Sequence, residues 1–123
     1  MPESLPSGAE ALKPVQVLSL WHDVVLQSVR GEGPDLSSRQ FAIMFIVYLD
    51  PPPHTVRGLA ATLGVSKPAI TRALDTLGGL DLLKRMRDEA DRRNVLVQRT
   101  AKGSAFMQDF AEIIMRSARG LLA

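Results

Sequence analysis

The sequence predicts a mainly α-helical chain with one small β-hairpin, arranged as a winged helix-turn-helix. Three observations predict this fold: two short amphipathic helices around a glycine turn, two short strands around a charged loop, and a strongly apolar helix toward each end. A length of 123 residues is typical of one domain. The expected parts are a loose tail over 1–13 and a domain over 14–123, which comprises terminal helices over 15–30 and 101–122, a helix-turn-helix over 55–77 and a wing over 82–99.

The N-terminal part combines a loose tail with a helix. Residues 1–13 are rich in Pro, Ser, Gly and Glu, a composition typical of a chain terminus without fixed structure. From Val15 to Val29 the apolar residues recur at helical spacing and cover an unusually wide face. The run Gly31–Pro34 then predicts the end of this helix.

A second helix is predicted over Phe41–Leu49 by a capping signal rather than by periodicity. Ser37 is followed three residues later by Gln40, which is the pattern of a capping box. The apolar run alone would also suit a buried strand. Three consecutive prolines, Pro51–Pro53, predict a firm end to the element.

Two short helices with the same apolar pattern form the predicted helix-turn-helix. Each places apolar residues at relative offsets of 0, 3, 4 and 7, counted from Val56 and from Ile70. Thr55 and Ser66 stand at the N-cap positions, and Gly64 makes the turn. The second helix of such a pair enters the major groove of DNA. Helix pairs of this kind also occur in proteins that do not touch DNA.

A charged hairpin follows and predicts the wing. The strands are expected at 82–87 and 94–98, with a loop over 88–93 between them. Arg92 and Arg93 can enter the minor groove, where narrow A·T-rich stretches carry an enhanced negative potential. Asp91 can orient one of these arginines through a salt bridge. The alternative is a solvated hairpin with a charge pair.

The distribution of charge supports a phosphate-binding surface in the middle of the chain. The net charge is only +2, but residues 67–103 hold nine Lys/Arg and five Asp/Glu, which gives them a net charge of +4. A local basic stripe is typical of nucleic-acid binding, whereas a solvated face is the alternative. On a helical wheel, the second helix of the pair turns polar residues away from its apolar face. These residues are Pro68, Thr71, Arg72, Asp75 and Thr76, with Ser66 and Lys67 at the helix start.

Two of these residues have specific expected roles. Arg72 is the candidate for a bidentate contact with guanine. Asp75 is unfavourable near phosphates, so it is expected to lie away from the DNA backbone or to accept a hydrogen bond from a cytosine amine.

Four segments in this order resemble the multiple antibiotic resistance regulator (MarR) family. They are Leu36–Phe41, Leu59–Arg72, Asp91–Arg93 and Thr100–Gly103, and the resemblance covers roughly residues 15–115. It implies a homodimeric winged helix regulator, often a repressor, often relieved by a small phenolic or other ligand. It also implies that Ser66, Lys67, Pro68, Ala69, Thr71 and Arg72 belong to the recognition helix, that Asp91 and Arg92 fit the wing motif, and that Arg92 enters the minor groove. With Thr55, Thr76 and Arg93, these are the predicted DNA-binding residues.

The sequence departs from the family pattern at three places. Asp81 stands where the family usually has glycine, and it can adopt a left-handed conformation at some cost. Arg99 stands where a leucine usually precedes the Thr100–Gly103 segment, which alters the packing expected beneath the wing. The sequence also ends at Ala123, early for the family, so a separate final helix is not expected.

The terminal helices are too apolar to be buried on one side only, which predicts an isologous homodimer. Its two recognition helices would read half-sites of a pseudo-palindromic operator about 10 bp apart. A monomer with a larger core is the alternative. A possible effector pocket is lined by Trp21, His22, Arg39 and Tyr48, although packing alone also explains each of these residues.

Several function classes are not expected. The chain has no cysteine, its two histidines lack ligand spacing, and no nucleophile elbow or phosphate-binding glycine loop is present. We therefore expect no metal, no cofactor and no enzyme. The sequence starts without a signal-peptide pattern and has no apolar run long enough for a bilayer, so a cytoplasmic location without membrane contact is expected. The remaining rival is a winged helix module for protein contact whose DNA binding has degenerated.

Overall fold

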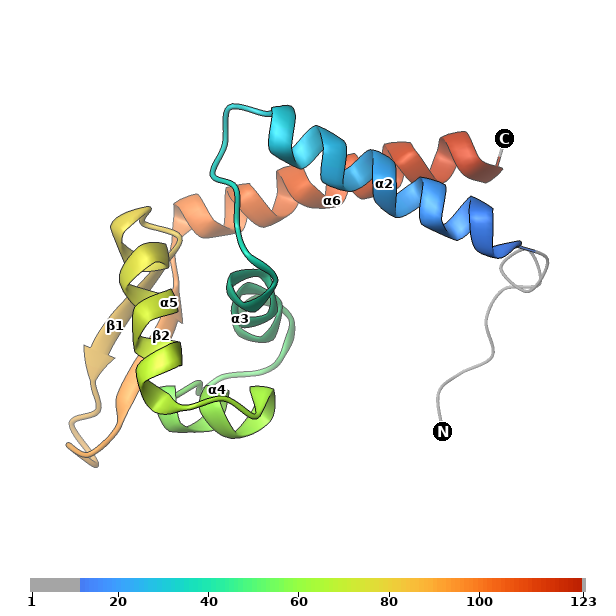
Figure 1. The fold of residues 1–123 in the computed structure, drawn as a ribbon. Helices are drawn as coiled ribbons and strands as arrows, with labels where there is room; N and C mark the ends of the chain where they lie inside the picture. Colours follow the sequence, from blue (N-terminus) through green and yellow to red (C-terminus); the bar gives the residue numbers. More distant parts are fainter. Residues whose placement is uncertain (1–11, 123) are drawn as a thin grey trace. The chain divides into compact units, whose positions relative to one another are not determined.

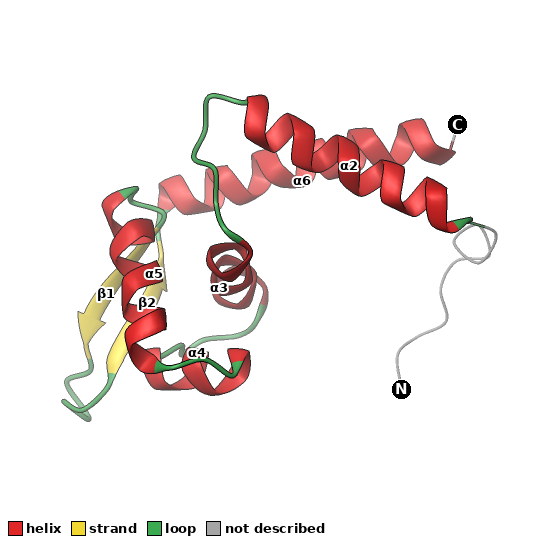
Figure 2. Cartoon of the chain, viewed as in Figure 1, coloured by secondary structure: helices red, strands yellow, loops and turns green. Residues whose placement is uncertain are grey.

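The computed structural model describes residues 12–122, so the predicted tail over 1–13 lies outside them except for its last two residues. The described elements are five helices and one hairpin: α2 (Pro14–Arg30), α3 (Ser38–Leu49), α4 (Val56–Leu63), α5 (Lys67–Gly79), β1 (Leu83–Arg87), β2 (Val95–Arg99) and α6 (Ala101–Leu122) (Figure 1). They form the predicted winged helix-turn-helix, with helices dominating and a single small sheet (Figure 2).

The chain divides into two compact units. We call Leu36–Gln108 the winged-helix unit, and the described residues up to Asp35 together with those from Asp109 the terminal-helix unit. The winged-helix unit holds α3, α4, α5, both strands and the first residues of α6. Over residues 12–122, no helix combines the length and the apolar character needed to cross a membrane.

The capping residues predicted from the sequence start three of the helices. Ser37 and Gln40 form a reciprocal capping box at the start of α3, with N–O distances of 3.2 and 2.8 Å. This confirms that the apolar run Phe41–Leu49 is helical rather than extended. The Thr55 hydroxyl accepts from the Gly58 amide at the start of α4, and the Ser66 hydroxyl accepts from the Ala69 amide at the start of α5.

The turn of the helix-turn-helix depends on a left-handed residue. Gly64 follows α4 with φ of 67°, a conformation that costs glycine little because it has no Cβ. Pro68 lies in the first turn of α5, where its missing amide leaves no intrahelical bond unmade. The two short helices are therefore fixed by local chemistry at both sides of the turn.

The core of the winged-helix unit is entirely apolar. Ile43, Met44 and Val47 of α3 are fully buried, and no polar or charged side chain is buried among the described residues. The other core side chains come from α4, α5 and the wing: Leu59, Ile70, Leu74, Leu77, Leu82, Leu83 and Val97. One face of every element in this unit is thereby joined to a single hydrophobic cluster.

The wing is a two-stranded antiparallel sheet attached to the helix-turn-helix at one edge. Arg85 pairs with Val97 near the middle of the hairpin. The Val97 amide donates to the His54 carbonyl at 2.8 Å, and Thr55 forms an isolated bridge with Leu96. The segment that leads into α4 thus extends the wing by one short stretch of β-pairing.

A hydroxyl group near the base of the wing joins three elements. The Tyr48 hydroxyl donates to the Leu82 carbonyl at 2.7 Å and accepts from the Thr100 amide at 3.0 Å. The Thr100 hydroxyl donates to the carbonyl of Asp81 and accepts from the amide of Gly103. Asp81 has φ of 59°, as the sequence predicts for a residue at the usual glycine position. We call Tyr48, Asp81, Leu82, Thr100 and Gly103 the wing-base network.

Arg99 replaces apolar packing by hydrogen bonds. Its Nε donates to the Val47 carbonyl at 2.7 Å and its Nη2 donates to the Asp50 carbonyl at 3.2 Å, both at the end of α3. Cationic groups at this position also favour the negative end of the helix dipole. The guanidinium lies 5.8 Å from the centre of the Tyr48 ring. These contacts explain how the wing base accommodates an arginine instead of a leucine at position 99.

In the terminal-helix unit, α2 lies beside the C-terminal part of α6 (Figure 1). Val24 and Phe110 are its buried apolar residues. The Asp23 carboxylate accepts hydrogen bonds from Gln27 on its own helix and from the Ser117 hydroxyl on α6. By contrast, α2 exposes a series of large apolar side chains: Val15, Val17, Leu18, Trp21, Val25 and Val29.

Gly103 provides a stability test of the wing-base network. A Cβ at this position would overlap the Tyr48 hydroxyl and the Leu82 carbonyl oxygen, whereas a Cβ at Gly120 on the same helix meets nothing within 4 Å. We expect Gly103→Ala to lower the free energy of unfolding by about 1–3 kcal/mol, measured by urea denaturation, because the network must open. Gly120→Ala makes the same chemical change and should be neutral or slightly stabilising. Equal stability of the two variants would contradict this packing.

Candidate nucleic-acid interface

The exposed side of α5 carries two parallel rows of side chains at four-residue spacing. Pro68, Arg72 and Thr76 form one row, which we call the outer row. Lys67, Thr71 and Asp75 form the other row, which borders the wing: Lys67 and Thr71 line a groove beside it, and Asp75 contacts Arg85 of β1. The helix therefore offers different chemistry toward the wing and away from it.

The groove between the helix-turn-helix and the wing has a volume of about 280 Å³. Four of its lining residues are cations: Arg57 from α4, Lys67 from α5, Arg85 from β1 and Arg93 from the wing loop. Its other lining residues are neutral: Val56, Thr71, Asn94 and Val95. We call this the basic groove. A concave surface with several cations and no carboxylate among its lining residues is suited to an anion such as a phosphate group.

The starts of both helices of the pair contribute to this surface. Arg57 is in the first turn of α4, and Lys67 is the first residue of α5. Helix N-termini carry a partial positive charge, so they add to the field of the four side chains. The predicted residues Thr55 and Ser66 serve here as N-caps, which position these helix starts. Ala69, also predicted, is buried against the core.

Five lining residues of the basic groove are not among the residues predicted from the sequence: the polar Arg57, Arg85 and Asn94, and the apolar Val56 and Val95. Arg85 was within the predicted wing, and the alternation of a strand gives it the same face as Val97, its cross-strand partner. Arg57 has a weaker signal, because only its place two residues after the N-cap Thr55 puts it in the first turn of a helix. The convergence of these side chains depends on how the wing folds back along α5.

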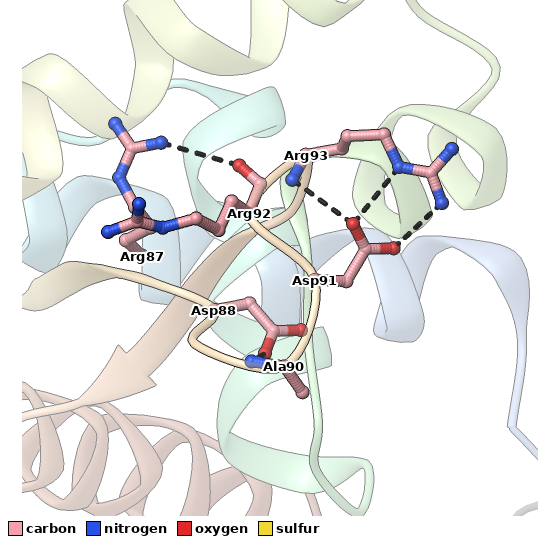
Figure 3. Close-up of polar contacts among 6 residues, drawn as sticks. All are labelled: Arg87, Asp88, Ala90, Asp91, Arg92 and Arg93. Atoms are coloured by element: carbon pink, nitrogen blue, oxygen red, sulfur yellow. Dashed lines mark hydrogen bonds and ion pairs between the residues drawn. The ribbon is translucent and has the colours of Figure 1, made fainter.

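The wing tip holds Arg93 in a fixed orientation (Figure 3). Asp91 accepts from Arg93 Nε and Nη2 through its two carboxylate oxygens, both at 3.0 Å, and from the Arg93 amide at 3.2 Å. The Arg93 guanidinium holds the pKa of the Asp91 carboxyl below its usual value of 3.8, and the Arg93 amide and the charge of Arg57 act in the same direction. This salt bridge is the one that the sequence predicts for one of the two arginines.

Arg92 extends from the same turn without such a partner. Its carbonyl accepts from Arg87 Nη1 at 3.4 Å, but its guanidinium makes no hydrogen bond or ion pair with the described residues (Figure 3). The loop itself is fixed by the Asp88 carboxylate, which accepts from the Ala90 amide at 3.0 Å, and by the Asn94 amide, which donates to the Asp91 carbonyl at 2.9 Å. An ordered loop thus presents one paired and one unpaired arginine.

Asp75 is tied to the wing. Its Oδ1 accepts from Arg85 Nη2 at 2.8 Å, and this ion pair joins the recognition helix to β1. The sequence predicts an Asp75 that avoids phosphates or contacts a base, without naming this partner. Because both side chains are partly exposed, the pair adds little to stability, at most about 1 kcal/mol.

The predicted effector-binding residues lie on two helices. Trp21 and His22 are on α2, and both are exposed. Arg39 and Tyr48 are on α3, and the Tyr48 hydroxyl is already bonded within the wing-base network. A separate cavity of about 390 Å³ in the winged-helix unit involves none of these four side chains; it is lined by Val47, Pro52, Pro53, His54, Lys84, Leu96, Val97, Gln98 and Arg99. Residues 12–122 contain no cluster of three or more His, Asp or Glu side chains that could hold a metal ion.

The Asp91–Arg93 pair predicts a specific pH response at the wing tip. Because the pKa of Asp91 is lowered in the folded protein, the pair is intact at neutral pH and breaks only as the pH falls through this lowered value. In an NMR titration of the side-chain carboxyls, we expect Asp91 to titrate below 3.8 and its pKa to rise in Arg93→Ala, because the Arg93 side chain is the largest cause of the lowering. Arg92→Ala is the matched control and should leave the pKa low. An unchanged Asp91 titration in Arg93→Ala would contradict the pairing.

Comparison with known proteins supports one family. Residues 36–95 match the model of the MarR family. No curated protein matches the sequence significantly. Among solved structures, a mutant of MepR from S. aureus is similar with a TM-score of 0.74 at 17% identity, covering 98% of this chain and 83% of that chain.

Two further structures share the fold. A transcriptional regulator from Thermotoga maritima is similar with a TM-score of 0.71 at 22% identity, covering 94% of this chain and 79% of that chain. CouR from Rhodococcus jostii, bound to p-coumaroyl-CoA, is similar with a TM-score of 0.60 at 23% identity, covering 84% of this chain and 68% of that chain. By its fold, this chain is a winged helix-turn-helix protein, and its residues 36–95 match the MarR family, whose members are transcriptional regulators rather than enzymes.

Proposed function

We propose that this protein binds double-stranded DNA sequence-specifically and regulates transcription, acting as a homodimeric repressor in the cytoplasm. The observation that carries the proposal is the basic groove, where four cations from four segments line one hollow beside the recognition helix. When cationic side chains neutralise DNA phosphates, the counterions condensed on the DNA are released, and this release supplies most of the affinity for any duplex. A protein-contact module would not need to bring Arg57, Lys67, Arg85 and Arg93 together.

The outer row of α5 is the proposed base-reading surface. Arg72 lies at its centre and is exposed, with Pro68 and Thr76 one turn away on either side. A guanidinium at this place on a recognition helix can donate two hydrogen bonds to the O6 and N7 atoms of guanine. The unpaired Arg92 and the oriented Arg93 of the wing tip are the proposed minor-groove residues.

The proposed dimer uses the exposed apolar side chains of α2. Val15, Leu18, Trp21, Val25 and Val29 fall on one face, within about a third of the helix circumference at 3.6 residues per turn. Leu18 is 70% exposed and Val15 is 66% exposed, which is unusual for a contiguous apolar row on a soluble surface. In a two-fold dimer, α2 of a second copy would cover this apolar row.

We also propose that a small-molecule effector modulates the affinity for DNA. CouR, which shares the fold, was solved with p-coumaroyl-CoA bound. By analogy, an effector of this chain would shift the population of states that bind DNA. Trp21, His22, Arg39 and Tyr48 stay a prediction from the sequence for contacts with such an effector.

The DNA proposal is tested by fluorescence anisotropy with labelled duplexes, including the promoter region of the protein's own gene, over a salt series. The logarithm of the affinity should fall linearly with the logarithm of the salt concentration. Arg92→Ala should weaken binding to all duplexes and reduce the slope by about one. Arg72→Ala should cost roughly 1–3 kcal/mol at the preferred site and relax specificity there.

Lys84→Ala is the control, since Lys84 lines the other cavity and not the basic groove. Parental binding by both Arg72→Ala and Arg92→Ala would contradict the roles assigned to these arginines. A folded dimer that binds no duplex at low salt would favour the protein-contact function instead.

The dimer is tested by sedimentation. Leu18→Glu places a charge in the middle of the exposed apolar row, so we expect it to convert a dimer into a monomer at micromolar concentration. Ala61→Glu adds the same charge at an exposed position of α4 and should remain dimeric. A parent protein that sediments as a monomer, or a dimeric Leu18→Glu, would contradict this interface.

A further inference from the structure

Asp75 is the only acidic residue of the recognition helix, and its place there has no explanation in stability. It belongs to the row of α5 that borders the wing, two turns after Lys67 and one turn after Thr71. Its side chain is 61% exposed, and its ion pair with Arg85 therefore stabilises the fold only weakly. A carboxylate beside the proposed path of the DNA backbone also repels phosphates. The small gain in stability therefore does not explain the acid at this position, and the repulsion of phosphates opposes it.

The partner of Asp75 is one of the four cations of the basic groove. Arg85 lines the groove with Arg57, Lys67 and Arg93, and it contacts Asp75 through a single Nη2–Oδ1 bond of 2.8 Å. A guanidinium that is bonded to a carboxylate has lost most of its net charge for a third partner. Arg93 is similarly paired with Asp91, but the wing tip also presents the unpaired Arg92. Within the described residues, Asp75 thus neutralises the cation nearest the second half of the recognition helix.

We propose that Asp75 determines specificity by withholding Arg85 from the DNA backbone, which weakens binding to duplexes of every sequence. This inference rests on the DNA binding proposed above. Phosphate contacts carry no sequence information, so each one removed lowers the affinity for random DNA without lowering base discrimination at the outer row. The ratio of specific to non-specific binding, rather than the affinity alone, decides whether a regulator finds its site. Suppressing unwanted binding through an unfavourable charge is a general route to specificity.

The geometry allows the charge to be removed without removing the contact. Asparagine keeps the Oδ1 acceptor that bonds Arg85 Nη2, so Asp75→Asn tests charge rather than shape. The double variant Asp75→Asn, Arg85→Gln also removes the cation that Asp75→Asn would make available to the DNA. Glu112→Gln on α6 removes one exposed negative charge from the terminal-helix unit and is the matched control for net charge.

The experiment measures anisotropy of a labelled random-sequence duplex of about 20 bp over a salt series with the full-length protein and these variants. Asp75→Asn should steepen the slope of log affinity against log salt by about 0.9, the contribution of one added phosphate contact. At 0.15 M salt this corresponds to roughly fivefold tighter binding. Adding Arg85→Gln should abolish the gain, and Glu112→Gln should leave the slope at the parental value. Circular dichroism checks that each variant is folded.

Two outcomes would overturn the inference while DNA binding stands. An unchanged or shallower slope in Asp75→Asn would mean that the carboxylate positions Arg85 on the backbone or contacts a base. A gain that persists after Arg85→Gln would mean that Asp75 acts by repulsion alone. If the parent protein itself shows no salt-dependent binding, the proposed function fails first, and the inference fails with it.

Discussion

The placement of the wing depends on the hydroxyl group of Tyr48. This one group bonds the carbonyl of Leu82, just before β1, and the amide of Thr100, just after β2, so it holds both ends of the hairpin against α3. Gly103 packs so closely on it that no side chain fits there. Arg99 fastens the same end of the wing to the last carbonyls of α3. A hairpin of two five-residue strands is not stable alone, so these bonds and the apolar core fix its orientation.

The basic groove is a consequence of this attachment. With the wing base held at α3 and its edge bonded to His54, the strand face that carries Arg85 turns toward α5. The N-caps of α4 and α5 bring the two helix starts to the other side of the same hollow. Cations that are far apart in the sequence, from Arg57 to Arg93, therefore meet without any of them being buried. The scaffold thereby positions exposed cations that a phosphate can contact.

Much of the fold could be predicted from local sequence signals. The Ser37–Gln40 capping box decided between helix and strand for an apolar run that periodicity left ambiguous. Thr55, Gly64 and Ser66 marked the helix-turn-helix, and Asp81 adopts the left-handed conformation expected at its position. These features succeed because each depends on contacts within a few residues of the chain.

The interface was harder to predict for a physical reason. Recognition-helix residues follow from helical periodicity, but the approach of Arg57 and Arg85 depends on long-range packing that no local pattern encodes. The bond between Asp75 and Arg85 spans only ten residues, yet it requires the wing to fold back on α5. Likewise, the sequence marks Tyr48 only as a candidate effector contact, because its role in the wing-base network depends on Leu82 and Thr100, which are distant in the sequence.

In the proposed complex, the basic groove rather than another surface receives the DNA backbone. The most direct test is an amide and side-chain NMR titration of the protein with a short random-sequence duplex at low salt. If the basic groove receives the DNA backbone, the perturbed signals should concentrate at Arg57, Lys67, Thr71 and Arg93, while Lys84 and Gln98 of the other cavity stay unchanged. Perturbations that avoid the basic groove, or that concentrate on the exposed apolar row of α2, would contradict it.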